Sequence, residues 1–385
     1  MNKVKLENTK IEIIDGDRGK NYPSKSDFFT KGYCVFLDAS NVTKSGFNLE
    51  NPLYISKEKS GLMRNGKLKK DDIVITTRGT VGNLAHYNEG INLNYKNIRI
   101  NSGMLIIRNS TDFNTKYLYY LLKSDIVAEQ IKQKTTGSSQ PQITVGILNE
   151  LVLLIPPLPT QSAIARVLST IDDKIVLNNK INRELENLAK TIYEYWFVQN
   201  ANKKWEKKKT GDLLKKYADN SLSIDVKNIY KTGKYPVITQ DVGDLIKGYT
   251  NEENPINDLP AIIFGDHSCT LRFLNFPFFR GADGTQLLYF ENEETTIYAY
   301  FCLYKIIPCL PNFGKYERHF KYLKDFEIII PPNQILQKFN KIVSPILSKI
   351  TDNLQENVYL AQLRDFLLPL LMNGQVKVKR GKNCL

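Results

Sequence analysis

The stretch Leu151-Val152-Leu153-Leu154-Ile155-Pro156-Pro157 decides how this chain is organised, because a second stretch with the same pattern occurs further along the chain. The second copy begins 175 residues later and reads Phe326-Glu327-Ile328-Ile329-Ile330-Pro331-Pro332. A helical pattern follows each copy, to about Phe197 and to about Met372. When the copies are superimposed without a gap, their apolar residues coincide: Ile164 on Phe339, Val167 on Ile342, Ile171 on Ile346, Ile175 on Ile350, Leu185 on Leu360 and Leu188 on Leu363. A long internal period predicts two equivalent blocks, each ending in a long helix.

Each copy predicts a strand that stops at proline and then a helix. Proline lacks the N–H donor that a sheet needs, so Pro156 and Pro157 end the strand. Thr160 is then expected to be the N-cap of the helix. Apolar residues follow at every third or fourth position, which is the period of one helix face. The longer step from Ile175 to Ile181 breaks a strict heptad and predicts a local change of winding.

The second helical segment repeats this pattern, except that Pro345 predicts a kink or a late helix start. Some 38 residues of helix span roughly 57 Å, which is too long for burial inside one block. We therefore expect the two helices to pack against each other as an antiparallel coiled coil. A plain two-helix linker between domains is the alternative.

The expected fold class is α+β. It consists of two mixed α/β domains in tandem, separated by the two long helices and related by a pseudo-two-fold internal repeat. The expected boundaries are 1–158 for the first domain, 159–200 for the central helix, 201–332 for the second domain, 333–376 for the C-terminal helix and 377–385 for a basic tail.

The charge of the chain indicates an acidic partner. The 385 residues carry a formal net charge of +13. Residues 1–150 hold 22 Lys and Arg against 15 Asp and Glu, and residues 331–385 hold 8 against 3. Because most of this excess lies outside the basic tail, it favours a folded surface that meets phosphates over a merely basic protein.

No apolar run approaches the roughly 18 residues that a membrane helix needs, and the first residues lack a signal-peptide core. We therefore expect a cytoplasmic protein without membrane contact. Five cysteines without close pairs fit reduced thiols. His267, Cys269, Cys302 and Cys309 match the spacing of no common zinc module, so no metal site is expected.

Polar turns follow two β-rich runs at matching places in the blocks. Asp72–Thr77 leads into the turn Arg78–Asn83, and Ala261–Phe264 leads into Gly265–Ser268. A second loop, Gly137–Gln142, precedes the last strand of the first block, and its counterpart Lys315–His319 carries different chemistry. Binding residues gather on such loop tips, and their divergence is expected if each block reads a different short sequence.

Catalytic motifs are poorly supported. Neither a P-loop nor a G-x-G-x-x-G string is present, and the three histidines lie beside no obvious nucleophile. Asn51-Pro52-Leu53-Tyr54 only partly matches the N-P-P-[YF] string of adenine methyltransferases. The chain is therefore expected to be a reader without a catalytic centre.

Four strings of this chain resemble conserved strings of one known family. They are Pro156–Ala165 (PPLPTQSAIA), continued to Trp196-Phe197, then Leu363–Val376 (LRDFLLPLLMNGQV), Gly16–Pro23 (GDRGKNYP) and Thr77–Gly82 (TRGTVG). The first resembles the central conserved region, and the second resembles the second conserved region, of the specificity subunits of Type I restriction–modification enzymes. The other two are similar to strings common in the target-recognition domains of that family. The likeness covers essentially the whole chain.

The resemblance implies a DNA-binding subunit whose two domains each read one half of a bipartite, gapped site in double-stranded DNA. The helices would serve as spacer and as docking platform for two modification (methyltransferase) subunits, which bind S-adenosylmethionine. Restriction (motor-nuclease) subunits that use ATP and Mg²⁺ would complete the complex. No cofactor is expected on this chain itself.

Candidate DNA-binding residues follow from the loops and the resemblance. In the first block they are Arg18, Lys20, Thr77, Arg78, Thr80, Asn83, Ser138, Ser139 and Gln140. In the second block they are Lys234, Tyr235, Gln240, His267, Ser268, Arg280, Lys315, Tyr316 and Arg318.

Three alternatives remain open. The chain could be the specificity subunit of a related Type II-like modification and restriction enzyme. It could be an enzyme with an unrecognised site, such as a methyltransferase or a nuclease. It could also be a helical scaffold that does not read DNA.

Overall fold

The computed structural model describes residues 2–44, 46–49, 51–88, 95–109, 113–135, 142–202, 204–215, 223–242, 245–281 and 284–378. The chain divides into two compact units. The first comprises Met1–Val176 with Val358–Leu385, and the second comprises Leu177–Asn357. The long helices α5 (Leu158–Glu194) and α9 (Asn333–Met372) each contribute one part to either unit.

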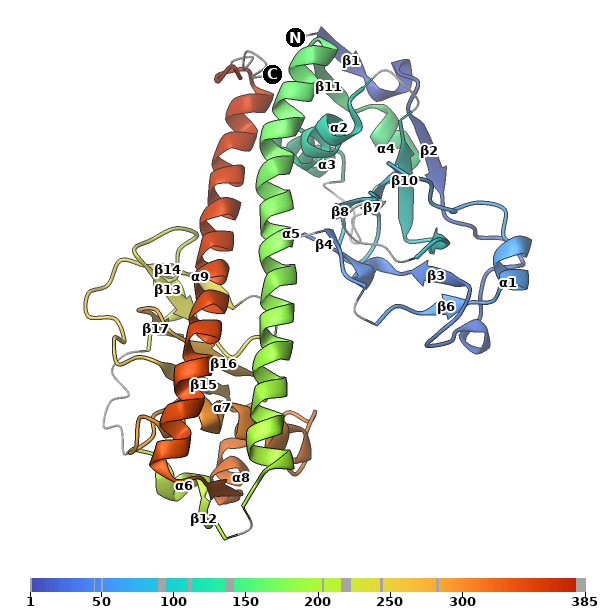
Figure 1. Cartoon of the computed structure of the whole chain (residues 1–385). Coiled ribbons are helices and arrows are strands. Elements are labelled where there is room, and N and C mark those ends of the chain that lie inside the picture. The colour runs from blue at the N-terminus through green and yellow to red at the C-terminus, as the bar shows by residue number, and fades with distance from the viewer. Residues whose placement is uncertain are drawn as a thin grey trace, which may run out of the picture. The chain divides into compact units, whose positions relative to one another are not determined.

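The first unit is built on a four-stranded antiparallel sheet in the order β2–β10–β7–β8 (Figure 1). A three-stranded sheet has the order β6–β3–β9, in which β3 and β9 are parallel. Two further pairs are β1–β11 and β4–β5. The strands are β1 Asn2–Lys5, β2 Glu12–Asp15, β3 Cys34–Leu37, β4 Val42–Thr43, β5 Gly46–Phe47, β6 Tyr54–Ile55, β7 Ile73–Thr76, β8 Leu84–His86, β9 Ile98–Ile100, β10 Met104–Arg108 and β11 Val152–Ile155.

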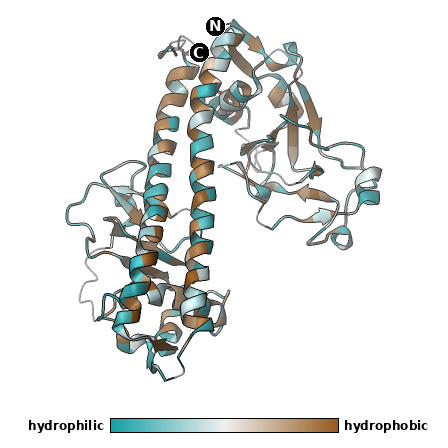
Figure 2. Cartoon of the chain, in the orientation of Figure 1, coloured by the Kyte–Doolittle hydropathy of each residue, from teal (hydrophilic) through white to brown (hydrophobic). Residues whose placement is uncertain are grey.

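The core of the first unit forms because β7 and β10 are apolar except for their last residues, Thr76 and Arg108, and their apolar residues are buried on both faces (Figure 2). The helices of this unit are α1 Lys57–Leu62, α2 Thr115–Lys123, α3 Asp125–Thr135 and α4 Val145–Asn149, with residues 158–176 of α5 and 358–372 of α9. Helix α2 buries six consecutive residues, Tyr117–Leu122. Ile164 and Leu168 of α5 and Leu371 and Met372 of α9 join the same core.

The second unit repeats the architecture of the first. Its sheets have the orders β16–β15–β18 and β14–β13–β17, with β13 and β17 parallel, and β12 pairs with β19. The strands are β12 Glu206–Lys209, β13 Tyr235–Ile238, β14 Ile246–Thr250, β15 Ala261–Gly265, β16 Leu271–Leu274, β17 Phe279–Arg280, β18 Thr285–Leu288 and β19 Glu327–Ile330. Its helices are α6 Thr210–Leu213, α7 Thr295–Ile306 and α8 Phe320–Asp325, with residues 177–194 of α5 and 333–357 of α9.

The internal repeat therefore extends to strand pairing. Strands β3, β6, β7, β8, β9, β10 and β11 correspond to β13, β14, β15, β16, β17, β18 and β19, and β1 corresponds to β12. The counterpart of β2 among the described residues is a single bridge from Leu214 to Phe290. The two tandem mixed α/β domains predicted from the sequence are confirmed.

The long helices run antiparallel. In the first unit the start of α5 packs with the end of α9, and in the second unit the end of α5 packs with the start of α9. In the second unit, asparagines form a buried layer between them. Asn353 Nδ2 donates to Asn182 Oδ1 (2.8 Å), and Asn178 Nδ2 donates to Asn357 Oδ1 (2.9 Å). The repeat offset relates Asn178 to Asn353 and Asn182 to Asn357, so these two hydrogen bonds are equivalent.

Three local predictions for the helices were wrong. Helix α5 begins at Leu158, so Thr160 is not its N-cap; Pro159 is tolerated because first-turn N–H groups have no acceptor within the helix. The late helix start predicted at Pro345 is wrong, because helix α9 begins at Asn333, while the alternative of a kink stays a prediction. Pro345 lies on an exposed face. There, water can satisfy the carbonyl that a proline leaves without a donor.

The change of winding predicted between Ile175 and Ile181 is also not observed, since α5 is continuous there. The asparagine layer occupies this interruption of the apolar stripe. The helix changes its winding further on, in a π-helical segment, Tyr195–Gln199. Within the described ranges, no helix is long and apolar enough to cross a membrane.

Candidate nucleic-acid interface

Loops of the first unit meet at one edge of its central sheet, where β2 and β7 end opposite the start of β10. The backbone N–H of Thr77 donates to the carbonyl oxygen of Gly103 (2.8 Å). Arg18 Nη2 donates to the carbonyl oxygen of Ser102 (3.3 Å). The fold thus brings the loops that carry Arg18 and the Thr77-Arg78 pair to the same sheet edge.

Arg78 is exposed and is oriented by Gln142, which lies in the loop before α4. With the Gln142 amide in the orientation that satisfies its hydrogen bonds, its oxygen accepts from Arg78 Nε (3.2 Å) and Nη2 (3.1 Å). This contact occupies one side of the guanidinium. The Nη1–Nη2 side is left to donate two parallel hydrogen bonds to a phosphate or a guanine edge.

Thr80 and Asn83 hold the turn in place through their side chains, whereas the Thr77 hydroxyl has no hydrogen-bond partner among the described residues. The Thr77 side chain is buried. Thr80 Oγ1 donates to the carbonyl oxygen of Ala39 (3.3 Å), and Asn83 Nδ2 donates to that of Val42 (2.9 Å). The side chains of Thr80 and Asn83 thus fix the turn between β7 and β8. The assignment of Thr77, Thr80 and Asn83 as DNA-binding residues stays a prediction.

The loop after β2 is fixed by a buried carboxylate that sequence reasoning passed over. Asp17 accepts from the backbone N–H groups of Gly19 (2.7 Å) and Arg64 (2.6 Å), and these hydrogen bonds lower its pKa. Arg18 pairs with Asp15 at 3.2 Å while remaining about half exposed, and Lys20 is exposed. Both cations are thus presented on an ordered loop.

Three candidates of the first unit, Ser138, Ser139 and Gln140, lie outside the described residues. Gln142, from the same string, was not among the candidates, although its contact with Arg78 makes it part of the site.

The second unit forms the corresponding site around the turn between β15 and β16. The backbone N–H of His267 donates to Gln240 Oε1 (3.0 Å), and the hydroxyls of Ser268 and Thr270 lie 2.9 Å apart. Gly284 permits this approach, because a Cβ at its position would lie 2.4 Å from Gln240 Nε2. The fold therefore brings the candidates Gln240, His267 and Ser268 together.

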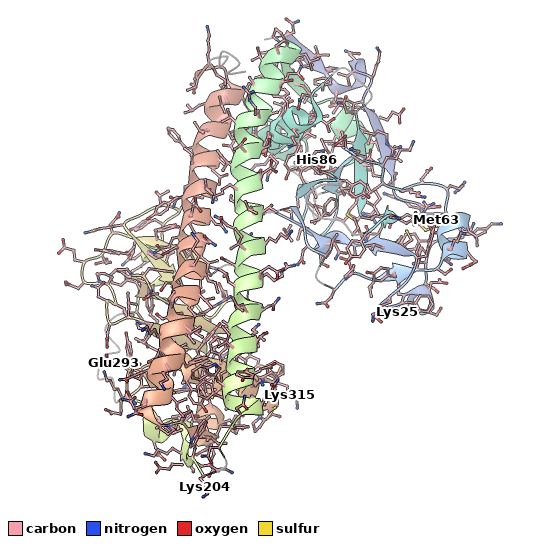
Figure 3. All side chains as sticks on the ribbon, viewed as in Figure 1. Lys25, Met63, His86, Lys204, Glu293 and Lys315 are labelled. Carbon is pink, nitrogen blue, oxygen red and sulfur yellow. The ribbon has the colours of Figure 1, made fainter. Side chains whose placement is uncertain are left out.

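The loop before α8 packs against this turn. His267 Nδ1 lies 3.1 Å from the carbonyl oxygen of Glu317, and the His267 ring stacks on Tyr316, with centroids 4.5 Å apart and planes at 6°. Tyr316 is 88% exposed, and its neighbours Lys315 (labelled in Figure 3) and Arg318 are also exposed. This is a flat aromatic platform between two cations, suited to stacking and to phosphate contacts.

Two residues that sequence reasoning did not select anchor this loop. His319 is fully buried, and its Nδ1 and Nε2 lie 3.0 Å and 3.2 Å from the carbonyl oxygens of Asp266 and Asn312. The Glu317 carboxylate accepts from Tyr322 Oη (2.8 Å) and Lys321 Nζ (3.0 Å), and these hydrogen bonds lower its pKa to about 2. His319 is the last residue of the loop Lys315–His319, so its place in the sequence beside the candidates Lys315, Tyr316 and Arg318 could have indicated its role.

Lys234, Tyr235 and Arg280 make no described contact with this cluster. Tyr235 packs edge-to-face on Phe279 (5.9 Å) with Lys234 Nζ 5.0 Å from its ring. Arg280 Nη1 donates to the carbonyl oxygen of Thr285 (3.3 Å). Their assignment as DNA-binding residues stays a prediction.

The two sites are equivalent in construction and different in chemistry. In each unit, the loop before a short helix (α4 or α8) contacts a residue that lies two positions after the end of a central strand. This residue is Arg78 after β7 and His267 after β15. One unit presents an arginine held by an amide, and the other presents stacked rings. Across the part of the chain that the structure describes, no three His, Cys, Asp or Glu side chains are grouped to hold a metal ion.

Comparisons with known proteins agree with this duplication. A family model described as the Type I restriction modification DNA specificity domain matches twice, over residues 9–187 and 202–359. The MjaIX specificity subunit of a Type I restriction enzyme from Methanocaldococcus jannaschii is 28% identical over 352 residues, covering 80% of this chain and 78% of its own. The HindI specificity subunit from Haemophilus influenzae is 28% identical over 185 residues, covering 48% and 39%.

Among solved structures, the S subunit of a Type I restriction–modification system from M. genitalium has the same fold. It is 17% identical with a TM-score of 0.57, and the match covers 96% of this chain and 95% of that chain.

Proposed function

The chain belongs to the family of Type I restriction–modification DNA specificity proteins, and from this premise we propose that each of its two units reads one half of a bipartite, gapped site in double-stranded DNA. The observation that carries the proposal is the pair of equivalent sites with different side chains. Equivalent construction places both at the same edge of a repeated sheet. Different side chains read different bases, since sequence is read by the groups that reach base edges.

In this proposal the exposed cations supply affinity and a few oriented groups supply sequence. Arg78 donates a bidentate pair of hydrogen bonds in the first half-site. The rings of His267 and Tyr316 contact the second half-site, with Lys315 and Arg318 on neighbouring phosphates. The chain itself is non-catalytic, and helices α5 and α9 act as the spacer between the two readers.

The helices also dock the partner subunits in this proposal. On α9, Tyr359, Leu363 and Phe366 are 68%, 46% and 66% exposed, and their spacing puts them on one face of the helix. On α5, Leu188 is 49% exposed, and it is the repeat equivalent of Leu363. Tyr195, in the π-helical segment that follows α5, is 60% exposed. The exposure of one leucine at equivalent places on both helices, each with an exposed aromatic residue nearby in the chain, supports the docking of two identical modification subunits.

These partners would bind S-adenosylmethionine and methylate adenine, and restriction subunits that use ATP and Mg²⁺ would add cleavage. A cytoplasmic location follows from this assignment.

Methylation-sensitive sequencing of the host genome, with the gene intact and deleted, tests the proposal. We expect N6-methyladenine to disappear from one two-part motif on deletion, which would also identify both half-sites. The reader role is contradicted if the modification complex that contains this chain binds and methylates DNA without sequence preference. Methyl transfer by the isolated chain would show that it is itself an enzyme.

A further inference from the structure

A pocket of about 390 Å³ lies in the first unit, on the turn between β7 and β8. The turn residues Val81, Gly82 and Asn83 form one wall, and α2 and α3 form another. Its floor is apolar and includes Ile75, Leu122 and Ile131. The pocket therefore shares a wall with the turn that begins with Arg78.

Three lysines line this pocket: Lys44 after β4, Lys123 at the end of α2 and Lys132 on α3. None of the other residues that line it is acidic. Cationic lining without a carboxylate excludes a cation as occupant and favours an anion, because lysine ammonium groups bind oxyanions as point charges.

Lys123 is held deepest of the three. Its Nζ lies 3.4 Å from the carbonyl oxygen of Lys44 and 3.4 Å from the hydroxyl of Tyr119, and 5.1 Å from the centre of the Tyr119 ring. Burial, together with the charge of Arg364, lowers the pKa of this amine, and the charges of Asp172 and Asp365, which do not line the pocket, offset only part of this effect. An anion in the pocket would replace the hydration that the ammonium loses there.

Lys44 and Lys132 are exposed at the pocket, so a rigid anion attached to a larger molecule can reach it. The β4–β5 hairpin that carries Lys44 is fixed to the recognition turn, because Asn83 Nδ2 donates to the carbonyl oxygen of Val42 (2.9 Å). The pocket and the reading residue Arg78 thus belong to one rigid construction.

We propose that this pocket seats one backbone phosphate of the DNA and sets the register of Arg78 on the first half-site, an inference that rests on the proposed function. DNA bound at the turn must pass a phosphate close to Arg78, since phosphates recur at every nucleotide. Phosphate contacts of this kind position a protein on the duplex and carry no sequence information.

The test uses the modification complex purified through a tag on this chain. Its binding to a duplex with the methylated motif, and to a scrambled duplex, is measured between about 50 and 200 mM salt. The variant Lys44→Ala/Lys132→Ala empties the pocket of its two exposed cations. The control Lys5→Ala/Lys134→Ala removes the same charge from two lysines of this unit that pair with Glu7 and Glu150.

We expect the pocket variant to reduce the slope of log K against log salt by about 0.9, the effect of one lost phosphate. Both duplexes should be bound more weakly by the same factor, so the preference for the motif should persist. The control should keep the slope, and Lys132→Arg should preserve it. Thermal unfolding should be unchanged in all these variants, because the substituted side chains are exposed.

An unchanged salt slope in a folded pocket variant would overturn the proposal. If such a variant also assembled more weakly with its protein partners, the pocket would hold an acidic protein segment instead of a DNA phosphate. A failure of the proposed function looks different: the unmodified complex itself would show no preference for any motif.

Discussion

Replacing Arg78 by alanine is expected to weaken reading of the first half-site and to leave the second unaffected. The structure gives the reason: Gln142 holds the Nε–Nη2 side of the guanidinium, so the remaining side is already oriented before DNA binds. A bidentate arginine contact discriminates bases by about 1–3 kcal/mol, which is about 5- to 150-fold in affinity. Folding stability should fall by only about 1 kcal/mol or less, because the side chain is exposed and loses hydrogen bonds to one partner.

The assay is equilibrium binding of the purified modification complex to duplexes that carry single base changes in either half of the motif. For Arg78→Ala we expect relaxed discrimination at one position of the first half-site and normal discrimination throughout the second. Arg318→Ala is the matched control, since it removes an exposed arginine from the other reader. Unaltered affinity together with unaltered sequence preference would refute the role of Arg78. Equal weakening on every duplex, with a smaller salt slope, would make it a phosphate contact instead.

Three further predictions concern stability, pH and assembly. Asp172→Asn should lower the free energy of unfolding by about 2 kcal/mol in urea titrations, because Asp172 accepts hydrogen bonds from Tyr120 Oη (2.6 Å) and Arg364 Nη1 (2.8 Å). The control is Asp173→Asn, which should change the free energy of unfolding by less than about 0.5 kcal/mol, because the Asp173 carboxylate is 46% exposed. Equal effects of the two substitutions would contradict the reasoning. Glu317 has a lowered pKa of about 2, so its stabilisation of the loop is complete above the ordinary pKa of 4.5 and is lost as the pH falls toward 2. In Glu317→Gln, the unfolding temperature should therefore fall less steeply between pH 4.5 and pH 2 than in the unsubstituted protein. An equally steep fall in both would show that Glu317 does not contribute to the acid dependence of stability. Phe366→Glu should reduce co-purification of modification subunits, whereas Phe366→Leu should not, and equal recovery with both would remove this face of α9 from the docking surface.

The order of blocks and long helices could be predicted because each of them produces a pattern among neighbouring residues. A strand that stops at two prolines and an apolar stripe at helical spacing occur twice at one offset, so the repeated block and helix follow from neighbouring residues alone. The details at Thr160, Pro345 and the interrupted stripe near Asn178 were not predictable. Each depends on what lies opposite the residue, which is solvent for Pro345 and another asparagine for Asn178.

The candidate site was predictable only in part. Turns after buried strands indicated where Arg78 and His267 lie, since such turns carry binding residues. Residue type does not separate a side chain that faces solvent from one that holds the turn. The hydrogen bonds of Thr80 and Asn83 to backbone carbonyls therefore appear only in the folded structure.

The sequence by itself determined the duplicated architecture, the family and the loops that carry recognition chemistry, because each is encoded in residues that are close along the chain. Only the tertiary structure decided which loops meet. The contact of Gln142 with Arg78, the stacking of Tyr316 on His267 and the convergence of three lysines on one pocket join segments from separate elements. Such contacts depend on how the sheets pair and pack, and side-chain pairs that form only after chain folding leave no periodic signal in the sequence.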